Sequence, residues 1–336
     1  MSRILAALAA LLLAVAGSAR AAVVSLHAAH TYSEDHAWHK GFEKLAEGLR
    51  ASGEAGLELN VHPRATWGGE NDNINSLRQG LLDLTVLPPS AMSTIAKNLA
   101  FLDVVFLCED REHWNRIVDG PIGERLAELI EAGTSQGEFP GLKVLGFWGG
   151  TRRHIVARRR TYTRLEDLAG LRLGVQDNAM NVEVWRALGL APVAVPLRNS
   201  IALLGADIVE GVESDLASAA ALKLGEVAPY VTLTGHSVTL RPLVMSEASW
   251  RKLTPVQQQA LVRAAAAATA LVRELEPRQD EQALEQLRAS GATVQELGDR
   301  TLLRTRSLEL RRRLAEVAGL SRLLAAIEQE AARPAR

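Results

Sequence analysis

Hydrophobic residues recur along this chain with two different periods, and segments of the two kinds follow one another in turn. Between 38 and 49 the spacing is three or four residues, which marks one face of a helix. Between 57 and 61 apolar and polar residues alternate, which marks a half-buried strand. The first strands are predicted at 23–26, 57–61 and 82–87, and the first helices at 38–49 and 74–81. Such alternation of strands and helices predicts a layered α/β structure.

A second series of the same kind begins near residue 142. Its strands are predicted at 142–147, 153–157 and 171–175. Gly149 and Gly150 are expected to interrupt the first two of them. Thr163 and Glu166 have the spacing of a capping box, in which the two side chains satisfy free backbone N–H groups at the start of a helix. The chain is therefore expected to contain two α/β regions.

One long helix is predicted from Thr254 to Ser290. Thr254 and Gln257 can cap its first turn, and Gly291 follows its last residue. Pro277 lies inside the segment and is expected to kink or break the helix, because proline lacks the N–H and collides with the preceding turn. An element of this length, bent near its middle, could tie two lobes together.

Composition narrows the class of protein. At 336 residues the chain is long enough for about two domains of ordinary size. Its 38 basic and 39 acidic side chains leave a formal net charge of −1, so the protein has no general positive field for nucleic acid. The single cysteine excludes an intramolecular disulfide and a zinc site built on several thiolates.

The first residues have the pattern of a secretory signal. Arg3 precedes an apolar run from 4 to 16, which is shorter than the ~20 residues that span a bilayer. The small residues Ala19 and Ala21 form a cleavage site, so residues 1–21 are predicted to be removed. We expect a soluble periplasmic protein, exported across the inner membrane, that depends on its core alone for stability.

No motif in the chain requires an enzyme. The sequence contains no nucleophile elbow, P-loop, dinucleotide-binding fingerprint or H-E-x-x-H motif. Cys108 lies in an apolar stretch, where a free cysteine behaves as a small hydrophobic residue. Four histidines cluster near the N-terminus, at His27, His30, His36 and His39. A metal site would need further ligands in the right geometry, so solvent-facing or pocket-lining histidines are favoured. We predict no catalytic residue, no metal and no cofactor.

Several segments resemble the periplasmic solute receptors of TRAP transporters, the DctP type. Family motifs such as G-x-R, eDLkGlKiRvp, lGa-p and DG-x-E have counterparts here, as does a P-x-x-q-L-G loop with Trp67 in place of leucine. The matching segments are 63–69, 77–84, 150–152, 165–173, 188–192 and 201–213. Each motif alone is weak, but their order across nearly the whole mature chain makes the set specific.

The resemblance implies a two-lobed, type II-like periplasmic-binding-protein clamp, with crossover strands between the lobes and the long kinked helix touching both. Lobe I is expected to hold residues 22–149 and 240–279, and lobe II residues 150–239 and 280–336. The implied function is to bind a small organic ligand, preferably a carboxylate, between the lobes and to deliver it to membrane-embedded TRAP permease subunits. We expect a monomer that binds no nucleic acid.

The family commonly holds its ligand's carboxylate with two arginines, and the resemblance carries over only one of them. The first falls on Arg152, whereas Gly174 replaces the second and is expected to open space. Arg172, on the same strand face, could partly substitute, although it stands at the family's lysine position. Glu210 and Ser214 replace an aspartate and an asparagine of the second lobe's motif. Loss of one bidentate contact would cost about 1.5–3 kcal/mol of the interaction with a carboxylate.

Further ligand-contacting side chains are expected around the same cleft. The candidates are Trp148 before the glycine pair, Trp67 and Glu70 on the glycine-rich loop, and His30 and Thr31 after the first strand. Strand alternation is expected to point Arg153 away from the face of Arg152. The ligand could be a carboxylate held by Arg152, or a neutral, cationic or larger molecule that needs no second arginine. A ligand-sensing module for a periplasmic receptor is the alternative to a transport protein.

Overall fold

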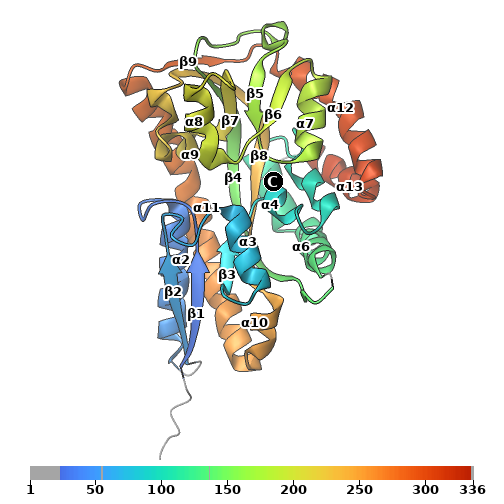
Figure 1. Cartoon of the computed structure of the whole chain (residues 1–336). Helices are drawn as coiled ribbons and strands as arrows, with labels where there is room; N and C mark the ends of the chain where they lie inside the picture. Colours follow the sequence, from blue (N-terminus) through green and yellow to red (C-terminus); the bar gives the residue numbers. More distant parts are fainter. Residues whose placement is uncertain (1–22, 54–55, 136, 334–336) are drawn as a thin grey trace, which may run out of the picture.

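The computed structural model describes residues 23–53, 56–135 and 137–333 of the chain (Figure 1). The predicted signal peptide, residues 1–21, lies outside these residues. Within the described residues, no helix is both long enough and apolar enough to cross a lipid bilayer.

The strands of the described chain join one mixed sheet. Its order is β2-β1-β3-β8-β4-β7-β5-β6, and β9 pairs with β8 beside this path. The strands are β1 Val24–Ala29, β2 Leu57–His62, β3 Leu84–Val86, β4 Leu142–Ala157, β5 Arg172–Val175, β6 Ala191–Ala194, β7 Gly211–Asp215, β8 Tyr230–Ser246 and β9 Thr293–Glu296. β1 pairs in parallel with β2 and β3, and β5 pairs in parallel with β6 and β7. The predicted α/β alternation in both halves of the chain is therefore confirmed.

Two long antiparallel strands, β4 and β8, cross the middle of the molecule and connect its two parallel parts. Figure 1 shows β1, β2 and β3 toward one end of these strands and β5, β6 and β7 toward the other. β4 continues through Gly149 and Gly150, where the sequence predicted a break, and its register shifts between Gly149 and Arg152. The positive φ angles of the two glycines, 103° and 91°, let the strand bulge there instead of ending.

The helix α11, Pro255–Ala289, packs against both parts of the molecule. Its first half shares a hydrophobic core with α2 (Ala37–Ala51). Its second half contacts α9 (Leu216–Ala221), where the Asp280 carboxylate accepts a hydrogen bond from the backbone N–H of Ala217 at 2.9 Å. The long helix that touches both lobes was predicted from the sequence and is confirmed.

Local chemistry explains where α11 begins and how the helix accommodates Pro277. Thr254 and Gln257 form the predicted capping box. Pro277 does not break the helix. The carbonyl of Arg273 loses its helical partner at Pro277 and accepts a hydrogen bond from the guanidinium of Arg111 instead.

Shorter helices cover the two faces of the sheet. They are α3 Glu70–Arg78, α4 Pro89–Met92, α5 Arg111–Val118, α6 Pro121–Thr134, α7 Ala179–Ala187, α8 Ser200–Gly205, α10 Glu247–Lys252, α12 Arg300–Val317 and α13 Ser321–Ala331, with 3-10 turns that include Lys97–Asp103 and Leu165–Leu168. The predicted capping box at Thr163 and Glu166 is shifted by one residue. The Asp167 carboxylate accepts from the backbone N–H of Arg164 at 3.0 Å, and the segment that follows is a single 3-10 turn.

The predicted lobe boundaries, at 149/150, 239/240 and 279/280, fall inside β4, β8 and α11, the elements that both parts share. The C-terminal helices also touch both sides, because α12 contacts α7 and α13 contacts α5 and α6. The assignment of residues to lobes stays a prediction.

Candidate ligand-binding cleft

A cavity of about 270 Å³ lies between the two α/β parts. It opens at the carboxyl ends of β1 and β5, the end of a parallel sheet at which ligands bind in α/β proteins. Segments from both parts line it, together with one residue from each crossover strand. Its polar side chains are Thr31, Tyr32, Glu70, Asn71, Ser90, Arg153, Gln176, Asp177, Arg198 and Arg241.

Arg153, on β4, is the most tightly held cation of this cavity. Its side chain is 3% exposed. Nε donates to Glu213 Oε2 at 3.4 Å, and Nη2 donates to the backbone carbonyl of Glu213 at 2.8 Å. Nη1 lies 4.0 Å from Asp215 Oδ2. Burial alone would raise the pKa of Glu213, but Arg153 and a neighbouring histidine lower it to about 2, so this carboxylate stays ionised.

Glu213 links Arg153 to the opposite wall of the cavity. Its Oε1 accepts from the backbone N–H of Gln176 at 2.9 Å, and its Oε2 lies 2.8 Å from His236 Nε2. Burial lowers the pKa of His236, so the ring is neutral and its Nε2 carries the proton that it donates to Glu213. His236 Nδ1 then accepts from the hydroxyl of Thr234 at 2.7 Å. One buried carboxylate thus positions an arginine and a backbone segment of the ligand site.

Arg241, on β8, is the second buried cation. Its Nη1 donates to the carbonyl of Leu240 at 3.1 Å and lies 3.8 Å from Asp103 Oδ1. Asp103 accepts from the backbone N–H of Ser90 at 2.8 Å through its other oxygen. Burial raises the pKa of Asp103 to about 6, against the opposing effect of Arg241 and Arg153.

Two contacts join the α/β parts across the cavity. Arg198 Nη1 donates to Asp72 Oδ2 at 3.1 Å. The hydroxyl groups of Tyr32 and Ser218 lie 2.8 Å apart. These contacts bridge the two α/β parts in this structure.

Two of the predicted ligand-contacting residues, Thr31 and Glu70, do line the cavity. Burial raises the pKa of Glu70, and the nearby Arg241 and Arg153 partly oppose this. Glu70 is the first residue of α3, directly after the glycine-rich loop, and Thr31 follows β1.

Arg152, the arginine that the motif pointed to, lies outside the cavity. Its side chain is exposed and borders a separate depression on the other side of the crossover strands, together with Arg300 and Glu296. Arg153 is the one that faces the ligand cavity. Arg152 and Arg153 do face opposite sides, as strand alternation predicted, but the cavity lies on the side of Arg153 and not on the side of Arg152, to which the motif pointed.

Gly174 and Ser214 lie near the cavity but do not open it. A Cβ atom at Gly174 would lie 2.8 Å from Val212 Cγ1 and 3.4 Å from Val195 Cγ2, so the space of the absent arginine is already filled. Ser214 is fully buried in β7 and lies opposite His154 of β4.

Arg172 and Glu210 lie at the far end of β5, in a surface cluster of charges. Arg172 Nη2 lies 3.3 Å from Asp207 Oδ1, and the same carboxylate also holds Arg158 and Arg159. Arg159 Nη1 lies 3.6 Å from Glu210 Oε1. Arg172 therefore does not substitute for an arginine at position 174.

The remaining candidates pack in the interior or against other aromatic rings. Trp148 is fully buried and donates from Nε1 to Thr269 Oγ1 at 3.0 Å. His30 Nε2 lies 3.0 Å from His39 Nδ1. Burial, above all, lowers the pKa of His30 to about 3. Trp67 is tilted against His62 with ring centroids 4.9 Å apart. None of the three lines the cavity.

Arg198 and Arg241 were not among the residues predicted from the sequence, and Arg153 was expected to face away from the ligand only because the motif placed the ligand at Arg152. A signal for Arg241 does exist in the sequence. It is the only arginine, lysine or acidic residue in the strand Tyr230–Ser246, and an isolated charge in a buried strand needs a partner or a ligand. Asp103 stands alone in the same way between Phe101 and Leu107.

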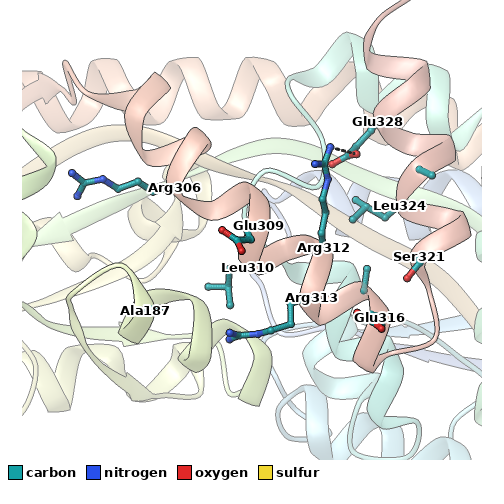
Figure 2. A pocket seen from close by; sticks show the side chains of 12 residues that line it. Ala187, Arg306, Glu309, Leu310, Arg312, Arg313, Glu316, Ser321, Leu324 and Glu328 are labelled. Atoms are coloured by element: carbon teal, nitrogen blue, oxygen red, sulfur yellow. Dashed lines mark hydrogen bonds and ion pairs between the residues drawn. The ribbon is translucent and has the colours of Figure 1, made fainter.

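Two other depressions of the described chain are wider and more open to solvent. Groups of three or more histidine, cysteine or acidic side chains that could hold a metal are absent from it. Figure 2 shows a wider groove of about 830 Å³ between α12, α13 and the end of α7. Its arginines are exposed, and one of them, Arg312, pairs with Glu328 at 3.2 Å. Solvated charges of this kind contribute little binding energy.

The chain is similar to known solute-binding proteins. The family model of the bacterial extracellular solute-binding proteins, family 7, matches residues 28–308. A solute-binding protein of Sulfitobacter sp. (strain NAS-14.1) is 31% identical over 278 residues, which are 82% of each protein. The 2,3-diketo-L-gulonate-binding periplasmic protein YiaO of Escherichia coli (strain K12) is 25% identical over 282 residues, 84% of each. The crystal structure of a TRAP periplasmic solute-binding protein from Sulfitobacter sp. NAS-14.1 with bound α-D-taluronate superposes with a TM-score of 0.84 at 28% identity, covering 90% of this chain and 97% of that one.

Proposed function

We propose that this chain, which belongs to family 7 of the bacterial extracellular solute-binding proteins, binds a sugar acid in the cavity between its two α/β parts and delivers it to a TRAP-type membrane permease. The resemblance to TRAP transporter receptors that the sequence motifs indicated is confirmed. Proteins of this family are receptors for solutes, and we propose that this chain likewise catalyses no reaction.

The observation that carries the proposal is the set of three arginines at the wall of one small cavity, Arg153, Arg198 and Arg241. A carboxylate that leaves water needs charge-assisted donors, and arginine supplies them in a planar fork. Glu70 and Asp177 line the same cavity and can accept hydrogen bonds from hydroxyl groups. Cations for an acid and acceptors for hydroxyls together suit a polyhydroxylated acid. The volume of about 270 Å³ is at the small end for ligand pockets.

Two of the relatives support this class of ligand. One is named for 2,3-diketo-L-gulonate, and the other holds α-D-taluronate in its crystal structure. Both molecules are sugar acids, so a sugar acid is the class to test first on this chain.

A neutral or cationic ligand is the second candidate, and one observation favours it. Arg153 already faces Glu213 and Asp215, and Arg241 already faces Asp103. The arginines are therefore partly neutralised by the protein itself, which reduces the electrostatic preference for an anion.

Binding assays with matched compounds separate the two candidates. We would record thermal shifts and calorimetric Kd values for D-galactonate, D-glucuronate and D-galacturonate, and for galactitol, D-glucose and D-galactosamine as neutral or cationic counterparts. A ligand at a hundred times its Kd stabilises the folded state by about 2.7 kcal/mol, which raises the Tm of a protein of this size by several degrees. We expect shifts of this size with the acids and much smaller ones with the neutral and cationic compounds. A shift confined to neutral or cationic compounds would refute the proposal.

Export and delivery need tests in cells. We propose that residues 1–21 are removed on export, so the N-terminal sequence of the periplasmic protein should begin at Ala22. Uptake of a labelled acid should require both this receptor and a permease. A ligand-dependent transcriptional response that persists without uptake would instead favour the sensing role.

A further inference from the structure

Fewer guanidinium nitrogens of Arg241 are hydrogen-bonded to the protein than of Arg153, the other buried arginine of the cavity. The side chain of Arg241 is 8% exposed and lines the cavity. Nη1 donates to the carbonyl of Leu240 at 3.1 Å. Within the described part of the chain, Nε and Nη2 of Arg241 have no hydrogen-bond partner. Among the described residues, neither nitrogen is one of the fully enclosed polar atoms without a partner, so an acceptor from a ligand or from water can reach them through the cavity.

The guanidinium of Arg153, by comparison, is already engaged by protein acceptors. Two of its nitrogens donate to Glu213, and the third lies 4.0 Å from Asp215. The only carboxylate that faces Arg241 within 4 Å among the described residues is Asp103, at 3.8 Å, which is beyond hydrogen-bond distance. Arg241 therefore keeps more of its capacity for an incoming anion than Arg153 does.

Asp103 is held in place by a hydrogen bond that does not involve Arg241. Its side chain is 5% exposed, and its Oδ2 accepts from the backbone N–H of Ser90 at 2.8 Å. It can act as a distant counter-ion for Arg241 while the cavity holds no anion. A ligand carboxylate at hydrogen-bond distance from Nε and Nη2 would then compete with Asp103 for the same guanidinium.

The position of Arg241 also orients the ligand. In the ladder between β4 and β8, Arg241 pairs with Trp148, whereas Arg153 pairs with Ser237. The two arginines thus reach the cavity from opposite sides of the bulge in β4. Arg153 and the loop at Gln176 line the same cavity, so a sugar acid held at Arg241 can also contact them.

We propose that Arg241 is the specificity-determining residue of this site: it hydrogen-bonds the carboxylate of the ligand through Nε and Nη2, and that carboxylate replaces Asp103 as its main counter-ion. The inference rests on the proposed function, that the cavity binds a sugar acid. It adds two points to that function. Arg241 is the arginine that distinguishes the acid from its neutral counterpart, and Asp103 is the protein carboxylate that opposes binding.

The experiment compares an acid with its alcohol in two variants of opposite expected effect. Arg241→Met removes the charge and keeps much of the packing of the stem. It should weaken the calorimetric affinity for the acid that binds wild type best by roughly ten- to a hundredfold, and should leave the affinity for the matching alcohol, galactitol for D-galactonate, nearly unchanged. Asp103→Asn keeps an oxygen for Ser90 but removes the competing charge. It should tighten binding of the acid several-fold.

Arg311→Met is the control, because Arg311 is equally buried but lies on α12 away from the cavity. It should leave both affinities unchanged. Equal losses for acid and alcohol in Arg241→Met, or no loss for either, would overturn the inference while the proposed function stands. Weaker acid binding in Asp103→Asn would overturn it as well, even if Arg241→Met failed to fold. If no acid binds the wild-type protein, the proposed function fails first and the inference fails with it.

Discussion

The ion pair between Arg198 and Asp72 joins the two α/β parts over the cavity, and it should slow the escape of a bound ligand. Arg198 Nη1 lies 3.1 Å from Asp72 Oδ2, and the two side chains are 58% and 52% exposed. Pairs with this exposure are worth about 0.2–1 kcal/mol, because water screens them and two flexible side chains must be ordered. Since the pair can form only while the parts are closed, its loss should appear as faster dissociation, by about 1.4- to fivefold.

Two substitutions disturb this pair in different ways. Asp72→Asn removes the charge but keeps an oxygen for the backbone N–H of Gly69, which Asp72 now accepts at 2.7 Å. Gly69→Ala keeps both charges, but its Cβ atom would lie 2.2 Å from Arg198 Nη1 and displace the guanidinium. The φ of Gly69, −81°, is open to alanine, so the backbone itself would not be strained.

Stopped-flow dissociation and calorimetry on these variants, on Arg198→Met and on the double variant Asp72→Asn/Arg198→Met would measure the coupling. We expect a coupling energy of about 0.2–1 kcal/mol that fades at high salt. Unliganded variants should melt within about a degree of wild type, because exposed substitutions of this kind change stability little. Additive effects of the two single substitutions, or dissociation rates equal to wild type in all variants, would refute the role of this pair in closure.

Three further predictions concern stability. Gly174→Ala should lower the free energy of unfolding by about 1–3 kcal/mol through the contact with Val212, measured by urea denaturation; an unchanged midpoint would mean that the strand can move aside. Thr269→Val should lower it by about 1–3 kcal/mol, because the buried Nε1 of Trp148 loses its acceptor, whereas Thr269→Ser should stay close to wild type. Burial, followed by repulsion from nearby carboxylates, raises the pKa of Asp280 to about 8, so its ionisation destabilises the folded state as the pH rises from about 4 through 8. Asp280→Asn should therefore melt above wild type at about pH 8.5 and together with it at about pH 4; parallel melting curves at all pH values would contradict this.

Local patterns in the sequence predicted the elements that local chemistry builds. The capping pair Thr254 and Gln257 begins the long helix where the sequence placed its start, and the alternation at 57–61 is the strand β2. These signals depend on residues only a few positions apart, so they can be recognised in the sequence without knowledge of the tertiary fold. The family was also accessible from the sequence, because its motifs stand in the same order along the chain.

The ligand site was predicted only in part, and the reason is geometric. Thr31 and Glu70 follow elements that the sequence located well. Alternation correctly put Arg152 and Arg153 on opposite faces of β4, but which face borders the cavity depends on how distant segments pack against the strand. The space at Gly174 depended on Val212, a residue of another strand.

The sequence by itself determined that this protein has two α/β regions and a long helix, and that it belongs among the solute receptors. The tertiary structure decided which charges face one another. Arg241 lies within reach of Asp103, and Arg153 within reach of Glu213, only because distant segments meet at the cavity. Secondary structure follows from interactions over a few residues, whereas the counter-ion of a buried charge comes from residues that only the tertiary fold brings together. Which arginine remains available to a ligand is therefore set by the fold.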